Sequence, residues 1–334
     1  MKITIMVIAK KKPQSGMSLV ELMVAMVIGL FLTAGVFTMF NMSSSNVTTT
    51  SQFNQLQENG RIALAIMERD ISQLGFMGDM TGTPLTGVAI TIDNPISGVD
   101  CIGEGLNNQT LPNAQLANFR FLWGYESGGS KSLSCLASSN VRGNTDVIQI
   151  KRVIGPSVLV ANSDQYFVLT DGTNEAIFFN DGLPSKAIAG ARLWEYQQHV
   201  YFIANDSAGV PVLRRKTLTD TGMDNDEQLV EGIENLRILY GVDSNNDSTP
   251  DSFVPASSVT TVMWENGSEP PQKLVALKLY ILVRSAQQDS SYINDTKYIL
   301  GDKVILAPKD HFRRKVMSVT VMLENAVLDG GQIL

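Results

Sequence analysis

Histidine and cysteine are scarce in this sequence of 334 residues, which contains two of each. His199 and His311 stand far from Cys101 and Cys135, so the spacing of a zinc site does not occur. A glycine-rich phosphate loop and the nucleophile elbow of serine hydrolases are also missing. These absences leave no pattern that indicates catalysis, and we expect a protein that is not an enzyme.

An excess of basic residues is missing as well. The chain has 26 Lys and Arg against 33 Asp and Glu, for a formal net charge of −7. Lys2, Lys10, Lys11 and Lys12 all precede Gly16, so that residues 17–334 hold 22 basic and 33 acidic side chains, or −11. Nucleic-acid binding depends on positive surfaces that attract phosphates. We therefore expect no direct partner among nucleic acids.

Charge is almost absent from residues 17–40, which hold the single ionisable residue Glu21. A helix of this length crosses a bilayer of ~30 Å at ~1.5 Å per residue. The lysines before it would remain in the cytoplasm, so the chain after residue 40 would lie across the membrane. A secretory signal would have a cleavage site with small residues after its apolar run. This run ends instead at the bulky Phe40. A plain signal anchor stays open on hydropathy alone.

Glu21 is the unusual residue of this apolar segment. A carboxylate in a membrane span costs a few kcal/mol and indicates a function with a specific partner. If the chain were cleaved after Gly16, Glu21 would be the fifth residue of the mature protein, one helical turn from the new amino group of Met17. We expect that ammonium, in the same chain or in a neighbouring subunit, to pair with Glu21.

The combination of Gly16, Met17 and Glu21 resembles the N-terminal motif of the type IV pilin and pseudopilin superfamily. The resemblance implies that a prepilin peptidase cleaves between Gly16 and Met17 and that Met17 is then N-methylated. Residues 1–16 would be the leader. Met at the first mature position departs from the more usual Phe. Residues 3–9 are apolar, which is unusual in a leader, so Met6 is an alternative start to Met1.

Residues 41–75 predict an amphipathic continuation of the membrane helix. Its apolar residues recur at spacings of three, four and seven: Phe53, Leu56, Ala63, Ile66, Met67 and Leu74. Gly75 and Gly78 would end the helix. A helix over residues 17–74 would be on the order of 90 Å long. Gly29, Gly35 and Gly60 would be its least stable positions.

The rest of the chain, residues 76–334, predicts a β-rich head. Short segments rich in β-branched or aromatic residues predict strands at 147–153, 158–160, 166–169, 176–179, 200–204, 274–283 and 313–323. Strands and helices do not alternate regularly, which favours antiparallel sheets. The expected fold class is α+β, similar to type IV pilins, with a long N-terminal helix packed on an antiparallel β-rich head.

Four later segments narrow the resemblance. They are residues 58–64 together with 70–71 and 75–76, then 236–243, 275–285 and 312–316. Their order and spacing resemble the PilW family of minor type IV pilins, which is related to the J-type pseudopilin of type II secretion. The resemblance extends over most of residues 8–325, although residues 80–145 match little. Family members often carry a cysteine just after the position of Phe76, which this sequence lacks, so no family disulfide is carried over.

Cys101 and Cys135 both follow the membrane segment. In an oxidising compartment they could close a loop of about 35 residues, a link worth roughly 3–4 kcal/mol. In a reducing cytosol they would be two inert thiols. Because we expect the head to lie outside the cytoplasm, we favour the disulfide.

One loop of the head indicates a possible calcium site. The side-chain oxygens of Asp243, Asn245, Asp247 and Asp251, at relative positions one, three, five and nine, match the start of the pattern typical of calcium loops. Thr249 would ligate through its backbone carbonyl, and Asp251 directly or through water. Ser248 in place of Gly, the stiff Pro250 and the lack of a Glu at position twelve weaken the match. The alternative is an acidic hairpin, because Asp and Asn are common in turns.

The PilW resemblance implies a low-abundance pilus subunit without catalytic activity. It would join other minor pilins in an initiating complex at the pilus tip, which the major pilin then extends. Its further partners would be the prepilin peptidase, which also methylates, and the inner-membrane assembly platform. The chain would lie in the inner membrane with its head in the periplasm before assembly, and on the cell surface afterwards. Two alternatives stay open: a pseudopilin of type II secretion, and a tip subunit with an adhesive or DNA-uptake role.

Overall fold

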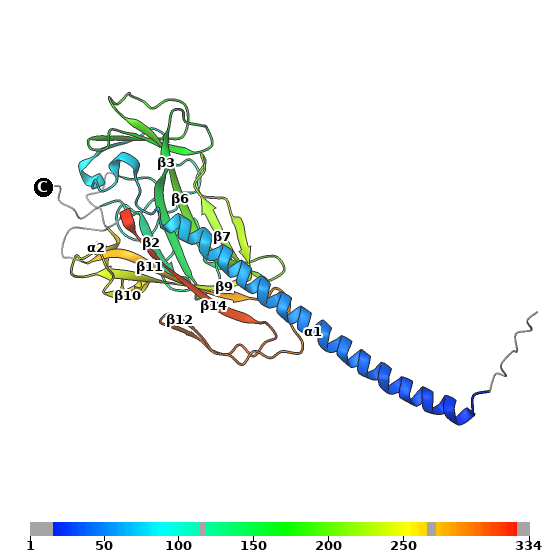
Figure 1. Ribbon diagram of the computed structural model, residues 1–334. Helices are drawn as coiled ribbons and strands as arrows, with labels where there is room; N and C mark the ends of the chain where they lie inside the picture. The colour runs from blue at the N-terminus through cyan, green and yellow to red at the C-terminus, as the bar shows by residue number, and fades with distance from the viewer. Residues whose placement is uncertain (1–15, 114–117, 266–271, 326–334) are drawn as a thin grey trace, which may run out of the picture. The chain divides into compact units, whose positions relative to one another are not determined.

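A computed structural model describes residues 16–113, 118–265 and 272–325, apart from the side chains at positions 45 and 48. The lysines of the expected leader lie outside these residues. The first element is the long helix α1 (Leu19–Ile71), and a second, one-turn helix is α2 (Thr261–Trp264) (Figure 1). Four short 3-10 helices are η1 (Gly78–Met80), η2 (Leu85–Gly87), η3 (Ser138–Asn140) and η4 (Ala256–Ser258).

The chain divides into two compact units within α1. The first unit extends through Gln52, and the second begins at Phe53 and holds the rest of the described chain. The second unit therefore contains the C-terminal part of α1 together with all the strands, and we call this unit the head.

The larger sheet of the head has eight strands. These are β1 (Ala89–Ile92), β2 (Leu122–Glu126), β3 (Asp146–Val158), β4 (Tyr166–Thr170), β5 (Glu175–Phe179), β6 (Arg192–Asn205), β7 (Pro211–Thr217) and β8 (Glu227–Glu231). Their order is β1-β5-β4-β6-β3-β2, and β7 pairs with β6 and β8. β1 runs parallel to β5, and every other pair in this sheet is antiparallel.

The smaller sheet has four strands. In spatial order they are β10 (Ser252–Pro255), β9 (Ile233–Asp243), β11 (Lys273–Arg284) and β14 (Arg314–Met322), all antiparallel. A separate hairpin joins β12 (Tyr298–Leu300) to β13 (Lys303–Ile305). The expected α+β class, with a long N-terminal helix and a β-rich head, is confirmed.

Most predicted strands lie within observed ones, with one error. Residues 158–160 do not form a strand of their own: Val158 ends β3, and Leu159 and Val160 follow it with 99% and 80% of their surface exposed. Their apolar character resembles that of a strand, but they lie in the connection to β4 and pair with no strand of the described chain. The predicted strand 200–204 is the second half of β6. In the first half of β6 apolar residues are interrupted by polar ones, and the sequence did not predict a strand there.

The C-terminal part of α1 packs on the head through one face. Leu56, Ala63, Met67 and Ile71 are buried, as their helical spacing predicts. Gly60 lies on the same face, and a Cβ atom there would collide with Met317 of β14 and approach Val283 of β11 to 3.0 Å. Gly60 is therefore a point of close contact between α1 and the smaller sheet, where the sequence suggested a weak point of the helix.

Asp70, near the end of α1, connects the helix to the larger sheet. It accepts hydrogen bonds from Arg152 of β3 at 2.8 Å and from Tyr201 of β6 at 2.7 Å, and it lies 2.5 Å from the Nδ1 atom of His199. Burial opposes ionisation of this carboxyl, but the hydrogen bonds and charges of His199 and Arg152 lower its pKa to about 2. A charged Asp70 thus holds α1 against β3 and β6.

A second charged cluster, around the buried Arg237, joins the two sheets. Arg237 of β9 contacts Asp146 of β3 and Glu126 of β2 at 3.1 Å each, and Asp302 at 2.7 Å. The hydrogen bond to Asp302, together with the charges of Asp146 and Glu126, raises the pKa of Arg237 against the effect of its burial. The guanidinium therefore stays charged and connects strands from both sheets.

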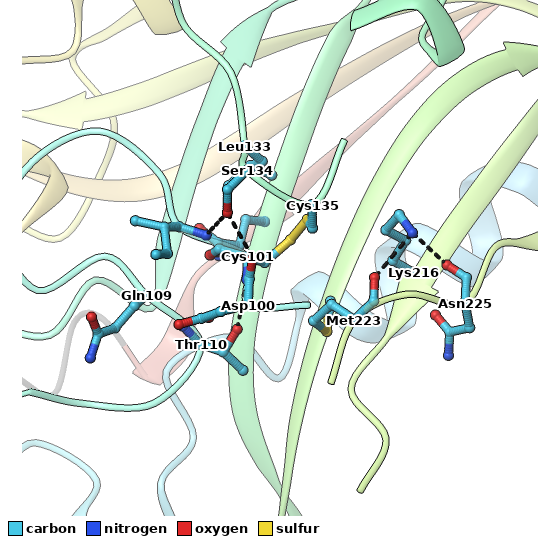
Figure 2. The surroundings of a disulfide bond; sticks show 12 residues. Asp100, Cys101, Gln109, Thr110, Leu133, Ser134, Cys135, Lys216, Met223 and Asn225 are labelled. Atoms are coloured by element: carbon cyan, nitrogen blue, oxygen red, sulfur yellow. Dashed lines mark hydrogen bonds between the residues drawn. A yellow bond between two sulfur atoms is a disulfide. The ribbon is translucent and has the colours of Figure 1, made fainter. Parts of the chain in front are cut away.

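The disulfide expected between Cys101 and Cys135 is present. Cys101 is fully buried, and its carbonyl accepts a hydrogen bond from Gln149 of β3 at 3.1 Å. The hydroxyl of Ser134 accepts from the Ile102 N–H and donates to the Asp100 carbonyl, each at 2.7 Å. Figure 2 shows Ser134 and Asp100 beside the disulfide. The bridge therefore fastens two irregular segments to each other, one before and one after β2.

Asp70→Asn should lower the free energy of unfolding of the detergent-solubilised protein by about 3 kcal/mol, because Arg152 would stay buried without its counter-charge. The folded pKa of Asp70 lies below its unfolded value, so its stabilisation is present above pH ~4 and is lost as the pH falls toward about 2. Denaturant titrations of both proteins should therefore differ at pH 7 and converge near pH 2. Glu68→Gln, an exposed change on the same helix, is the control. Equal stability of Asp70→Asn and wild type at pH 7 would contradict this role.

Reduction of the disulfide should destabilise the head by roughly 3 kcal/mol, because the unfolded chain regains the freedom of a long loop. The melting temperature should fall when dithiothreitol is present, as measured by circular dichroism. The double variant Cys101→Ser, Cys135→Ser should melt at the lower temperature with or without reductant. An unchanged melting temperature after thiol titration has verified reduction would refute a stabilising role.

Candidate functional site

The start of α1 is closed by its own side chains. The Glu21 carboxylate accepts the backbone N–H of Ser18 at 2.9 Å, and the Ser18 hydroxyl accepts the N–H of Val20 at 3.4 Å. This is a capping arrangement, in which a Ser before the helix and a Glu three residues later satisfy free N–H groups. The Ser-x-x-Glu spacing is a signal in the sequence from which this cap could be predicted.

The predicted cleavage bond lies just ahead of this cap. Gly16 and Met17 precede the first helical residue, Leu19, and both are exposed. In the uncleaved chain Met17 is linked to Gly16, so its nitrogen is an amide and not an ammonium. Glu21 is bonded to Ser18 in this state. Cleavage, methylation and the pairing of Glu21 with Met17 stay predictions.

The membrane-length part of α1 exposes nearly all of its apolar side chains. Leu19, Phe31 and Met39 each have about three-quarters of their surface exposed, and the apolar window of the helix is not buried within the structure. Its two threonines bond within the helix, Thr33 to the Gly29 carbonyl at 2.9 Å and Thr38 to that of Ala34 at 2.8 Å. By length and composition this helix can cross a membrane.

The predicted calcium loop forms a tight acidic turn after β9. Asp243 accepts the N–H groups of Asn245, Asn246 and Ser248 at 3.1, 2.7 and 2.8 Å. Asp251 accepts both the N–H and the hydroxyl of Ser244.

The other candidate ligands of this loop bond to one another. Asp247 accepts from the backbone N–H of Thr249 at 2.8 Å and also contacts its hydroxyl, while the side-chain nitrogen of Asn245 donates to Asp247 at 3.1 Å. No group of three His, Cys, Asp or Glu side chains is placed to hold a metal ion anywhere in the described ranges. The turn is thus accounted for by its own hydrogen bonds, and calcium binding there stays a prediction.

The two histidines have structural contacts. His199 lies in the buried cluster around Asp70, and the Nδ1 atom of His311 is 2.7 Å from the Tyr292 carbonyl. The sequence could not reveal that His199 and Asp70, which are 129 residues apart, would meet. Arg152 and Tyr201 also bond to Asp70, so the contact between His199 and Asp70 is part of the structural cluster between α1 and the larger sheet.

A cavity of about 300 Å³ lies in the head beyond the end of α1. Its lining is mainly apolar and includes Leu74, Met77, Leu85, Phe121, Trp264 and Leu323. Glu265 is the acidic residue in the lining, and it is paired with Arg120 at 3.0 Å. The cavity could accept an apolar group, and no sequence pattern indicated it.

Comparison with known proteins finds two family matches and a distant structural one. The family described as Type IV Pilus-assembly protein W matches residues 200–325, and the prokaryotic N-terminal methylation motif matches residues 11–37. A type IV-like pilin from Thermus thermophilus is 13% identical, with 81% of this chain and 97% of that chain covered at a TM-score of 0.35. None of the curated proteins compared with this chain matches it.

The two family matches cover different parts of the structure, the start of α1 and the strands of the head. The methylation motif covers the capped, exposed start of α1, and the PilW match begins within β6 and extends past β14, through the smaller sheet. The chain therefore carries a prokaryotic N-terminal methylation motif at the start of α1 and a PilW domain over residues 200–325.

Proposed function

We propose that this protein is a minor pilin that helps to initiate assembly of a type IV pilus. A prepilin peptidase cleaves it between Gly16 and Met17 and methylates Met17. The mature chain waits in the inner membrane with its head in the periplasm. It then joins other minor pilins in a tip complex that the assembly platform extends with the major pilin.

The exposed apolar part of α1 is the observation that carries this proposal. Full burial of one large apolar side chain is worth about 1.5–3 kcal/mol, and this helix exposes more than a dozen of them. Such a surface requires lipid before assembly and other apolar helices afterwards. A subunit with this helix can therefore move from membrane to fibre without exposing the helix to water.

Glu21 supplies the specificity that apolar packing lacks. Lipid and neighbouring helices are equally apolar, so contacts between smooth apolar helices define no register. A carboxylate among apolar side chains is unfavourable unless a positive group satisfies it. In the mature chain the Met17 ammonium of a neighbouring subunit would meet this need, which would favour one docking position over others along the helix.

Two alternative roles use the same helix. A pseudopilin of type II secretion would need the same motif, and neighbouring genes for minor pilins or for secretion components would separate the two. A tip subunit with an adhesive or DNA-uptake role is favoured by the size of the head and by its apolar cavity. The acidic balance of the chain disfavours direct contact with DNA.

Glu21→Ala should leave membrane insertion unchanged while reducing incorporation into sheared pili by roughly tenfold, equivalent to a loss of about 1.4 kcal/mol. Fractionation and immunoblotting measure the two quantities. Glu21→Gln is the matched variant, because Gln can still accept the Ser18 N–H but carries no charge. If the charge matters, both variants lose incorporation. Wild-type incorporation of Glu21→Gln would refute the ammonium pairing.

Calcium binding by the loop 243–251 is tested by thermal denaturation. Millimolar calcium should raise the melting temperature of wild type, while Asp243→Asn, Asp247→Asn should show no such rise because the loop would lose two carboxylate ligands. Magnesium at the same concentration is the control for ionic strength. No calcium-specific shift in wild type would remove the prediction and leave the loop as a hydrogen-bonded turn.

A further inference from the structure

Lys151 on β3 is fully buried, and no acidic side chain of the described ranges forms an ion pair with it. Its Nζ atom donates to the Gln109 carbonyl at 2.7 Å and to the side-chain oxygen of Asn108 at 3.5 Å. The same atom lies 4.2 Å from the ring centre of Phe119. A lysine kept charged in such a place is costly, since carbonyls and a ring replace its water and no ion pair compensates in full.

The surroundings favour the neutral amine. Burial lowers the pKa of Lys151 well below its ordinary value, against the charge of Asp100 and with that of Arg120. A neutral lysine amine has a free electron pair and is a nucleophile. The described contacts of Lys151 include none with α1 or with the Gly16–Glu21 motif.

The carboxamide of Asn108 is held beside that amine. Asn108 is buried, and its side-chain nitrogen donates to the Glu104 carbonyl at 3.0 Å. Arg120 donates to the same carbonyl at 2.8 Å and so helps to fix it. With its nitrogen on Glu104, the carboxamide turns its oxygen toward Lys151. Two reacting groups held together in a dry site react far faster than they would in solution.

We propose that Lys151 and Asn108 form an intramolecular isopeptide bond. The electron pair of the neutral Nζ atom attacks the carboxamide carbon of Asn108, and the bond from that carbon to the side-chain nitrogen breaks. The proton that Nζ gives up passes to the departing nitrogen, and ammonia leaves. The reaction needs no oxidant and no cofactor.

The crosslink would hold the least regular part of the head. Residues 93–121, between β1 and β2, contain no strand or helix among those described. The disulfide attaches this segment to residues 127–145 through Cys101, and the isopeptide bond would attach it to β3 through Asn108. Two covalent links would thus hold a segment that has no strand hydrogen bonds to hold it. Such links would resist unfolding if the protein is pulled.

Tryptic digestion of the full-length protein after reduction and alkylation tests the proposal by mass spectrometry. An unlinked chain yields residues 70–120 and 143–151 as separate peptides, because trypsin cuts after Arg and free Lys. The crosslinked chain should yield a branched peptide of residues 70–120 and 143–152. Its mass should equal the sum of those two segments less one ammonia, and unlinked 143–151 should be nearly absent.

Two variants control the experiment. Lys151→Met should yield residues 70–120 and 143–152 as separate peptides. Lys216→Met removes another lysine of the same sheet, which donates to the carbonyls of Met223 and Asn225 at 3.0 and 2.8 Å, and should leave the branched peptide intact. Quantitative recovery of unlinked residues 143–151 from folded wild type would overturn the proposal, whatever the stability of the variants.

Discussion

The contact of the C-terminal part of α1 with both sheets is the constraint on which the head depends. Asp70 binds Arg152 and Tyr201 of the larger sheet, and Gly60 brings the helix against Met317 of the smaller one. One helix face thus provides a charged contact and a close apolar contact. Each sheet alone would leave part of that face in water, so the head requires both.

The division of α1 explains how one helix serves two environments. Over residues 53–71 its apolar face is narrow and is matched by strands, while over residues 19–40 apolar side chains surround the helix and are exposed. The charged groups follow the same division. Arg237 and Asp70 are compensated inside the head, whereas Glu21 is bonded only to the start of its own helix among the described contacts.

The sequence predicted the features that depend on local pattern. The helix, its amphipathic half and the alternating strands β11 and β14 follow from periodicity, and the Gly16–Glu21 motif is contiguous. The pairing of Asp70 with His199 and of Lys151 with Asn108 depends on which distant segments become neighbours. Strands such as β7 and β8 were missed because their charged residues hide the alternation. The cysteines were paired correctly because the chain contains no others.

Gly60 also restricts the order in which substitutions can accumulate. A side chain at position 60 would first meet the flexible end of Met317, which a shorter residue at position 317 would lack. It would next meet Val283, whose β-branched side chain has few alternative rotamers. A shorter residue at position 317 would therefore remove the nearest obstacle to a later change at position 60, whereas the reverse order passes through an overpacked intermediate. In related chains the residues at these positions should vary together.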